Sequence, residues 1–219
     1  MEKMDGKTRN ERRILLWALF LSSLIGTTYW YLKRLTAAPF GQWGTETVEF
    51  ISFFTNLTNL IVIIMAGALL FGRGRLHNWF KSPAVQAACC LYIAFVGLAF
   101  WFLLGGPTYL QTTLDWLPEI TAHSLSPILG AIFWYRCVPK GQMAWRHAVL
   151  WLAYPIAYLV YWLFRGPRVG YYPYFFIDVN ALGYGGVAVW SGALIVIFLV
   201  LGTLMWLVDR RQARRSLIA

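Results

Sequence analysis

Two short polar stretches, each set inside a run of apolar residues, carry the side chains best suited to chemistry. The first is FFTNLTNL (53–60), in which two hydroxyls and two amides fill four of eight positions: Thr55, Asn56, Thr58 and Asn59. The second is HSLSP (123–127), which begins with the imidazole of His123. A hydroxyl beside an imidazole base is a pairing that enzymes use to form covalent acyl intermediates. The two stretches therefore predict a nucleophile–base pair of Thr55 and His123.

Helical spacing places these side chains on polar faces. A helix turns by ~100° per residue, so one helix over 48–71 sets four polar residues within roughly 60° of Ser52: Glu49, Thr55, Asn56 and Asn59. Thr58 lies at the edge of this face. A helix over 119–135 sets His123, Ser126 and Gly130 within about 40° of Glu119. Because polar groups in a membrane turn away from lipid, both faces should meet other helices or a cavity. The alternative for His123 is a structural hydrogen bond to a neighbouring helix.

The two stretches are also predicted to lie at similar depth, since both helices run from the outer to the inner side. At about 1.5 Å per residue, Thr55 is ~11 Å and His123 ~8 Å from the outer end of its helix. A further helix, over 147–164, presents one face of aromatic and basic side chains: Tyr154, Tyr158, Tyr161 and Arg165. This face either packs in bulk or lines a headgroup pocket with phenol donors. Asp178, in the next loop, either orients His123, pairs with Arg165, or is a solvated acid.

The elements that position these residues follow from the composition. Hydrophobic residues make up 59% of the 219-residue chain and charged residues only 13%, whereas soluble domains carry about 25% charged residues. A membrane-spanning helix needs roughly 20 apolar residues. Six runs meet this need, and the first lacks the pattern of a cleaved signal peptide. We therefore predict an all-α integral membrane protein with six transmembrane helices: 14–32, 48–71, 84–104, 119–135, 147–164 and 186–208.

The basic residues predict the orientation. Lys and Arg cluster at both termini and in the loops after the second and fourth helices: Lys3, Lys7, Arg9, Arg12, Arg13, Arg73, Arg75, Lys81, Arg136, Lys140, Arg146, Arg210, Arg211, Arg214 and Arg215. The opposite loops hold only four: Lys33, Arg34, Arg165 and Arg168. Since basic residues gather on the cytoplasmic side, both termini are predicted to be cytoplasmic. The net charge of +10 then indicates contact with anionic lipid headgroups rather than with nucleic acid.

The remaining patterns argue for one domain without a cofactor. No linker or internal repeat divides residues 1–219, and the lack of repeats argues against a secondary transporter. The cysteines show no paired spacing for zinc or a disulfide: Cys89, Cys90 and Cys137. His77 and His147 are predicted near the cytoplasmic face, away from His123, which argues against paired haem ligands. We expect neither a metal nor another cofactor, and the sequence does not indicate a protein partner.

Four segments together resemble the bacterial six-helix membrane proteins called Pr-six-Pr. They are FFTNLTNL (53–60), HSLSP (123–127), YPIAYLVYWLFRG (154–166) and YYPYFFIDVNALGYGG (171–186). This family is similar, more distantly, to the eukaryotic androgen-induced protein family. The resemblance covers most of the chain, from the first to the sixth helix. It implies a six-helix bundle in a bacterial inner (plasma) membrane.

The eukaryotic relatives imply an activity, because they are described as intramembrane hydrolases of fatty acid esters of hydroxy fatty acids. Their threonine nucleophile follows an aromatic-hydrophobic pair early in the second helix, which matches Thr55, although Thr58 stays open as an alternative. Their histidine precedes a proline in the fourth helix, which matches His123 and Pro127. The lipid substrate would enter from the bilayer, and other polar residues would bind it or its oxyanion: Ser52, Asn56, Asn59, Ser126, Tyr154, Tyr158 and Asp178. The alternative function is non-catalytic binding of a lipid or quinone, or passage of a small solute.

Overall fold

The computed structural model describes residues 6–107 and 113–215, and every regular element among them is helical. The chain separates into two compact units, residues 1–139 and 140–219. The prediction of a single domain stays a prediction.

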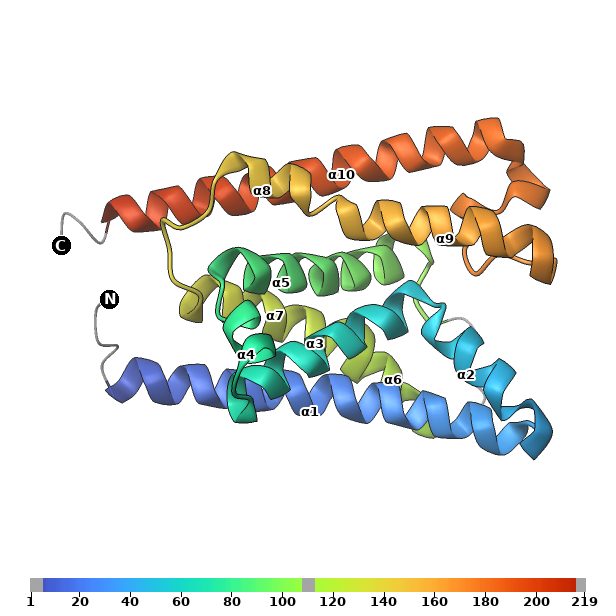
Figure 1. Ribbon diagram of the computed structural model, residues 1–219, viewed down its shortest axis with the longest axis horizontal. Helices are drawn as coiled ribbons and strands as arrows, with labels where there is room; N and C mark the ends of the chain where they lie inside the picture. The colour runs from blue at the N-terminus through green and yellow to red at the C-terminus, as the bar shows by residue number, and fades with distance from the viewer. Residues whose placement is uncertain (1–5, 108–112, 216–219) are drawn as a thin grey trace. The chain divides into compact units, whose positions relative to one another are not determined.

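Unit 1 is built around four helices that pack in a ring. The helices are α1 (Gly6–Ala37), α3 (Phe54–Phe71), α5 (Pro83–Leu98) and α7 (Ser126–Cys137). Each packs against the next in chain order, and α7 returns to α1 (Figure 1). All four contribute apolar side chains to the buried core: Leu19, Val62, Met65, Ile93 and Phe133. Shorter elements complete the unit: η1 (Phe40–Gln42), α2 (Trp43–Ile51), α4 (Arg75–Phe80), η3 (Thr113–Asp115) and α6 (Trp116–Ile120).

The second predicted helix is interrupted, which corrects one of the polar faces. α2 ends at Ile51, and Phe53 has an extended backbone (φ −80°, ψ 132°) before α3 begins. The Ser52 hydroxyl donates to the Val48 carbonyl (2.6 Å), and the Asn56 amide donates to the Phe50 carbonyl (2.9 Å). Polar side chains thus satisfy the end of α2, where helical partners stop. Because the helical rotation does not continue across the break, the prediction that Glu49 and Ser52 share one helical face with Thr55 is wrong. Glu49 instead pairs with Arg34 of α1.

Two other helices contain a π-helical turn. Turn η2 (Ala99–Leu103) continues α5, and turn η4 (Thr121–Leu125) joins α6 to α7 without interruption. A π-turn is a local widening of a helix that is frequent at functional sites. The predicted helices 84–104 and 119–135 are therefore present as helical runs, each with one widened turn.

Unit 2 contains α8 (Trp145–Leu150), α9 (Ala153–Val169), η5 (Phe175–Ile177) and α10 (Val179–Arg215). The predicted helix 147–164 is divided by a turn at Trp151–Leu152. α10 packs against α8 and η5 and is longer than the predicted 186–208, with a non-helical residue at Gly183 (φ 65°, ψ 170°). Asp209 of α10 is buried and accepts hydrogen bonds from the backbone N–H groups of Gly141 (3.0 Å) and Met143 (3.4 Å).

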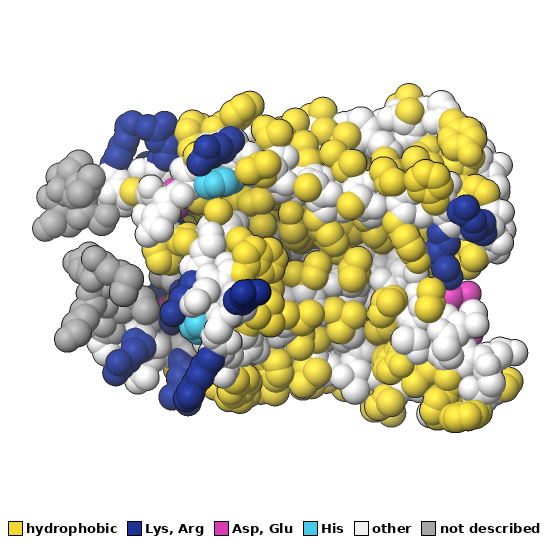
Figure 2. All heavy atoms as spheres, viewed as in Figure 1, with side chains coloured by type: hydrophobic (Ala, Val, Ile, Leu, Met, Phe, Trp, Pro, Cys, Tyr) yellow, Lys and Arg dark blue, Asp and Glu magenta, His cyan; other side chains and the backbone are white. Residues whose placement is uncertain are grey.

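Five helical runs are long and apolar enough to cross a membrane: 6–37, 54–71, 83–103, 145–169 and 179–215. Many large apolar side chains on them face outward, such as Ile14, Phe164 and Val189. Figure 2 shows apolar side chains over the flanks of the helices, with Lys and Arg toward helix ends. The protein is therefore an integral membrane protein with at least these five candidate spans. The sixth span and the cytoplasmic termini stay predictions, and Lys3 lies outside the described residues.

Candidate functional site

His123 lies on turn η4 and is held against turn η2. Its side chain is only 11% exposed, and its ring stacks on Phe100, with ring centroids 4.0 Å apart and an interplanar angle of 15°. A second contact joins the same two turns, because the indole Nε1 of Trp101 donates to the Ser124 hydroxyl (3.1 Å). The imidazole is thus fixed between two widened turns of neighbouring helices.

A carboxylate lies beside the imidazole. Glu119 is one turn before His123 and 1% exposed, and its Oε2 is 2.9 Å from His123 Nδ1. Trp30 of α1 donates its indole N–H to the other carboxylate oxygen (3.2 Å). The Nε2 atom of His123 has no hydrogen-bond partner among residues 6–107 and 113–215. Nδ1 is therefore the ring nitrogen next to the acid, at ion-pair distance but without the geometry of a hydrogen bond, and Nε2 is the nitrogen that can meet a substrate or nucleophile.

Two glycines let the neighbouring helices come close to η4. A Cβ built on Gly26 of α1 would lie 2.5 Å from the Thr121 hydroxyl. A Cβ built on Gly97 of α5 would lie 2.7 Å from Pro127 Cβ and 3.1 Å from the His123 carbonyl oxygen. Small residues at helix contacts allow such close approach of backbones in membranes. His123 therefore keeps its position because Gly26 and Gly97 have no side chain to push η4 away.

The first turns of α3 reach the same region. Asn59 is fully buried and donates to the Thr55 carbonyl (3.0 Å) and, across the interface, to the Ala122 carbonyl of η4 (3.5 Å). Thr55 is half-buried, whereas Thr58 has no exposed surface. The Thr55 hydroxyl makes no hydrogen bond in the described chain, to His123 or otherwise. A nucleophile must be reached by substrate, so burial favours Thr55 over Thr58 for that role.

The N-terminal end of α3 supplies backbone donors beside Thr55. The first N–H groups of a helix have no partner within the helix, and this end carries the positive part of the helix dipole. The backbone N–H groups of Thr55 and Asn56 have no carbonyl partner from another described element. The side-chain amides of Asn56 and Asn59, by contrast, already donate to the carbonyls named above. The backbone is therefore the better source of donors for an oxyanion near Thr55.

Ser126 belongs to a buried cluster of hydroxyls between α1 and α7. Its Oγ lies 2.7 Å from Ser22 Oγ and accepts a hydrogen bond from Ser23 (3.0 Å). All three residues are buried. The hydroxyl cluster lies one helical turn beyond His123. It is on the same interface as the Glu119–Trp30 contact.

The remaining predicted residues lie in unit 2. Tyr158 is buried near Tyr174, with ring centroids 6.4 Å apart, and Tyr154 is half-buried on the same helix, α9. Asp178 precedes α10 and accepts hydrogen bonds from the backbone N–H groups of Asn180 (2.9 Å) and Ala181 (3.3 Å). Asp178 thus caps the start of α10. Arg165 lies over the Trp162 ring at 5.8 Å.

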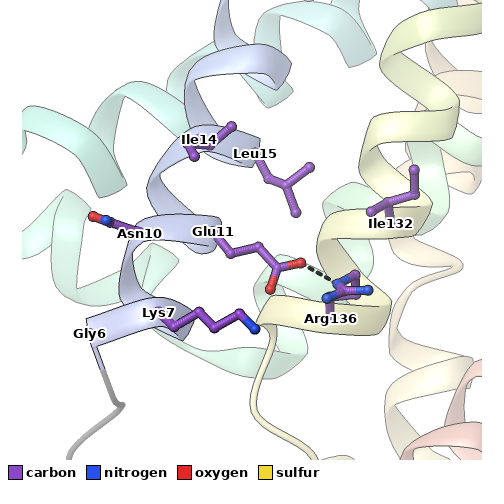
Figure 3. Close-up of a pocket in the computed structure, with 8 residues that line it drawn as sticks. All are labelled: Gly6, Lys7, Asn10, Glu11, Ile14, Leu15, Ile132 and Arg136. Carbon is purple, nitrogen blue, oxygen red and sulfur yellow. Dashed lines mark ion pairs between the residues drawn. The ribbon is translucent and has the colours of Figure 1, made fainter.

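A separate groove of about 760 Å³ lies between the start of α1 and the end of α7. It is lined by charged, polar and apolar residues: Gly6, Lys7, Asn10, Glu11, Ile14, Leu15, Ile132 and Arg136. Figure 3 shows Lys7 and Glu11 extending from α1 toward α7, where Glu11 forms an ion pair with Arg136. None of the residues predicted from sequence to form a site lines this groove.

Sequence reasoning missed four residues that contact the site, and it also missed Asp115, whose buried carboxylate pairs with Lys33 of α1; the four are Ser22, Ser23, Trp30 and Phe100. Only Asp115 had a usable signal, since it precedes Glu119 by four residues and His123 by eight. No group of three or more His, Cys, Asp or Glu side chains that could hold a metal occurs among the described residues. Comparison of the chain with known protein families, with curated proteins and with solved structures gives no match.

Proposed function

We propose that this protein hydrolyses esters of membrane lipids, such as fatty acid esters of hydroxy fatty acids, with Thr55 as the nucleophile and His123 as the base. The observation that carries the proposal is the buried Glu119–His123 pair, whose imidazole keeps Nε2 open. An acid beside a histidine base is part of the arrangement that activates hydroxyl nucleophiles in other hydrolases, and here the two groups lie within ion-pair distance. The resemblance to the androgen-induced protein family supports the same two residues.

The proposed reaction has two steps. The Thr55 hydroxyl gives its proton to His123 Nε2 and attacks the ester carbonyl carbon, and the backbone N–H groups at the start of α3 stabilise the oxyanion. The intermediate expels the alcohol, which takes the proton from His123 and leaves an acyl-threonine. A water molecule then loses a proton to His123 and attacks the acyl group, and the fatty acid departs as Thr55 regains its proton. Glu119 stabilises the imidazolium in both steps.

Substrate binding has to bring Thr55 and His123 into contact. No hydrogen bond joins them in the described chain, and catalytic hydrogen bonds often tighten only when substrate is bound. Asn59 already ties α3 to η4 through the Ala122 carbonyl. Two adjustments could bring the Thr55 hydroxyl to the His123 ring. One is a rotation of the Thr55 side chain, and the other is a small shift at the break between α2 and α3.

The test combines covalent labelling with turnover. The purified protein in detergent is treated with a fluorophosphonate probe and, separately, with a lipid ester whose released fatty acid is measured by mass spectrometry. Labelling and turnover should disappear in Thr55→Ala and His123→Gln and persist in Thr36→Ala, which removes an exposed threonine at the end of α1. Loss in Thr58→Ala with retention in Thr55→Ala would move the nucleophile to Thr58. Absence of both signals in the unmodified protein would remove the enzyme proposal.

The groove between α1 and α7 favours a second candidate function, non-catalytic binding of an anionic lipid. Lys7 and Arg136 offer positive charge, which Glu11 offsets only in part, and Ile14, Leu15 and Ile132 offer an apolar wall for an acyl chain. Native mass spectrometry of protein with phosphatidylglycerol or phosphatidylcholine separates the cases. A preference for phosphatidylglycerol that is lost in Lys7→Ala supports this function, and equal binding of both lipids contradicts it.

In this proposal the chain forms six spans with both termini in the cytoplasm of a bacterium. The groove then lies at the inner leaflet, and the Glu119–His123 pair lies in the outer half of the bilayer. Cysteine substitutions in loops 38–42 and 170–174, tested with an impermeant thiol reagent on intact cells, would establish the orientation.

A further inference from the structure

A column of polar contacts fills the interface between α1 and the run α6–η4–α7. The column begins at Asp115, which pairs with Lys33 and also accepts a hydrogen bond from Tyr29 (3.2 Å). Next comes Glu119, between Trp30 and His123. The last level is Ser126, which contacts Ser22 and Ser23. Asp115, Glu119, His123 and Ser126 follow each other at intervals of one helical turn, so the column is continuous along one helix face.

The column opens at one end and is closed at the other. The Lys33 side chain is 33% exposed, while the Asp115 side chain next to it is 1% exposed. From Asp115 to Ser126 the column spans ~16 Å, about half of the hydrocarbon thickness of a bilayer. Beyond the serines the same interface holds a layer of buried apolar side chains, Leu16, Leu19 and Phe133, before the groove at Leu15 and Ile132 begins.

A positive charge lies past this apolar layer. Arg12 of α1 donates to the Cys137 carbonyl (2.7 Å) and to Gln86 Oε1 (3.0 Å), and its guanidinium lies 5.3 Å from the Phe133 ring centre. Fixed arginines oppose the passage of protons in membrane pores. The buried apolar layer and Arg12 therefore both oppose passage of a proton beyond the serine end of the column.

We propose that Asp115, Glu119 and His123 form a proton path that connects the His123 ring with the aqueous phase at the Lys33 end and stops at the serine cluster. Chains of Asp, Glu and His within membrane helices are typical of proton relays. A small rotation of the His123 ring turns its Nδ1–H onto the Glu119 carboxylate, whose Oε2 is 2.9 Å away, and the proton passes to this oxygen. It then passes through one water molecule to Asp115, about 6 Å further along the helix face. The proton leaves beside Lys33, and the reverse sequence returns it.

The path gives the proposed hydrolysis a proton exchange that does not cross the membrane, and to that extent it rests on the proposed function. Ester hydrolysis at neutral pH releases a proton with each fatty acid, and an enclosed imidazole would otherwise retain it. The other charged groups near the mouth are already paired, since Arg34 binds Glu46 and Glu49 of α2. From turn η2, the apolar ring of Phe100 stacks on His123.

Proton exchange at His123 can be measured without any substrate. The chain has three histidines, so protein labelled with ¹⁵N-histidine in lipid nanodiscs gives a simple spectrum, which His77→Gln, His123→Gln and His147→Gln assign. In Asp115→Asn and Glu119→Gln, exchange of the His123 ring proton with water should slow by roughly tenfold, the factor that corresponds to 1.4 kcal/mol at the barrier. Glu49→Gln, which removes an equal charge near the same end, should leave the exchange rate unchanged.

The outcomes separate a proton path from structural contacts. If the column only holds helices together, Asp115→Asn and Glu119→Gln lower the unfolding temperature but leave His123 exchange at the unmodified rate, and the proposal is overturned. If Glu119→Gln does not fold, Asp115→Asn still decides, because Asp115 lies at the mouth. Slowed exchange in a protein that shows no ester turnover would retain the path and remove only the hydrolase proposal.

The closed end has its own test. Proteoliposomes loaded with the pH dye pyranine are given an acid pulse with valinomycin and potassium present. Proton entry should equal that of protein-free vesicles. A faster entry that Glu119→Gln abolishes would show that the path crosses the membrane and would overturn the closed end.

Discussion

The close approach of α5 to η4 and the start of α7 makes Gly97→Ala an informative substitution. The added Cβ would lie 2.7 and 2.9 Å from two carbons of the Pro127 ring and 3.1 Å from the His123 carbonyl oxygen, whereas carbon atoms in favourable contact are about 3.5–4.0 Å apart. The proline ring is part of the backbone and cannot rotate away. The two helices must therefore separate by roughly 1 Å at this point.

The expected cost follows from this separation. Overpacking of a filled interior costs typically ~1–3 kcal/mol, and alanine returns up to about 1 kcal/mol through its better helix propensity. We expect a net loss of about 1–2 kcal/mol in the free energy of unfolding. The effect on turnover should be larger, because a misplacement of ~1 Å in a catalytic group can lower the rate about 100-fold.

The assay compares three glycine variants in the same detergent. Unfolding is followed by tryptophan fluorescence during titration with sodium dodecyl sulfate, and the His123 ring is followed by its ¹⁵N chemical shifts. Gly192→Ala of α10 is the control, since a Cβ there meets no atom within 4 Å. Gly130→Ala should lie between the two, because its Cβ would meet Ile93 Cγ2 at 2.7 Å, the end of a side chain that can move.

A Gly97→Ala protein with unmodified stability and unmodified His123 shifts would refute the tight contact between α5 and η4. An equal loss in Gly192→Ala would instead show that the assay responds to glycine replacement in general.

Three further predictions concern polar contacts outside the Thr55–His123 pair. Ser126→Ala removes two buried hydrogen bonds and should lower the free energy of unfolding by about 2 kcal/mol, whereas Ser191→Ala serves as a control; detergent unfolding measures both. Asp209→Ala leaves the N–H groups of Gly141 and Met143 without their acceptor, so cleavage by trypsin at Lys140 should become faster; unchanged cleavage would contradict the bond. Asp178→Ala removes the cap of α10 and should destabilise unit 2 by ~1 kcal/mol, while Asp178→Asn, which can also cap, should restore most of it.

Much of the helical content could be predicted from the sequence because a bilayer requires long apolar runs. The runs at 14–32 and 186–208 lie within α1 and α10, and both observed helices are longer, since polar residues extend them at the ends. The break at Ser52–Phe53 could not be predicted, because neither glycine nor proline marks it. Ser52 and Asn56 stabilise the break by hydrogen bonds to carbonyls of α2. In the sequence, their spacing is the same as that of residues on one continuous helical face.

The candidate site, too, could be predicted from the sequence only in part. The spacing of Glu119 and His123 indicates one helical face, and the structure places the two side chains 2.9 Å apart. Phe100 and Trp30 come from other helices, and no local pattern could select them among the 18% of residues that are aromatic. The pairing of Thr55 with His123 stays a prediction.

The widened turn at Thr121–Leu125 has a consequence for how sequences of this type can vary in length. A π-turn amounts to an α-helix with one residue inserted, so excision of a single amino acid from this segment would restore regular winding. Ser126 and all that follows would then swing by ~100° relative to Glu119, away from Ser22 and Ser23. Chains one residue shorter here would keep their hydropathy profile and their span and yet lose the juxtaposition of acid, imidazole and hydroxyls.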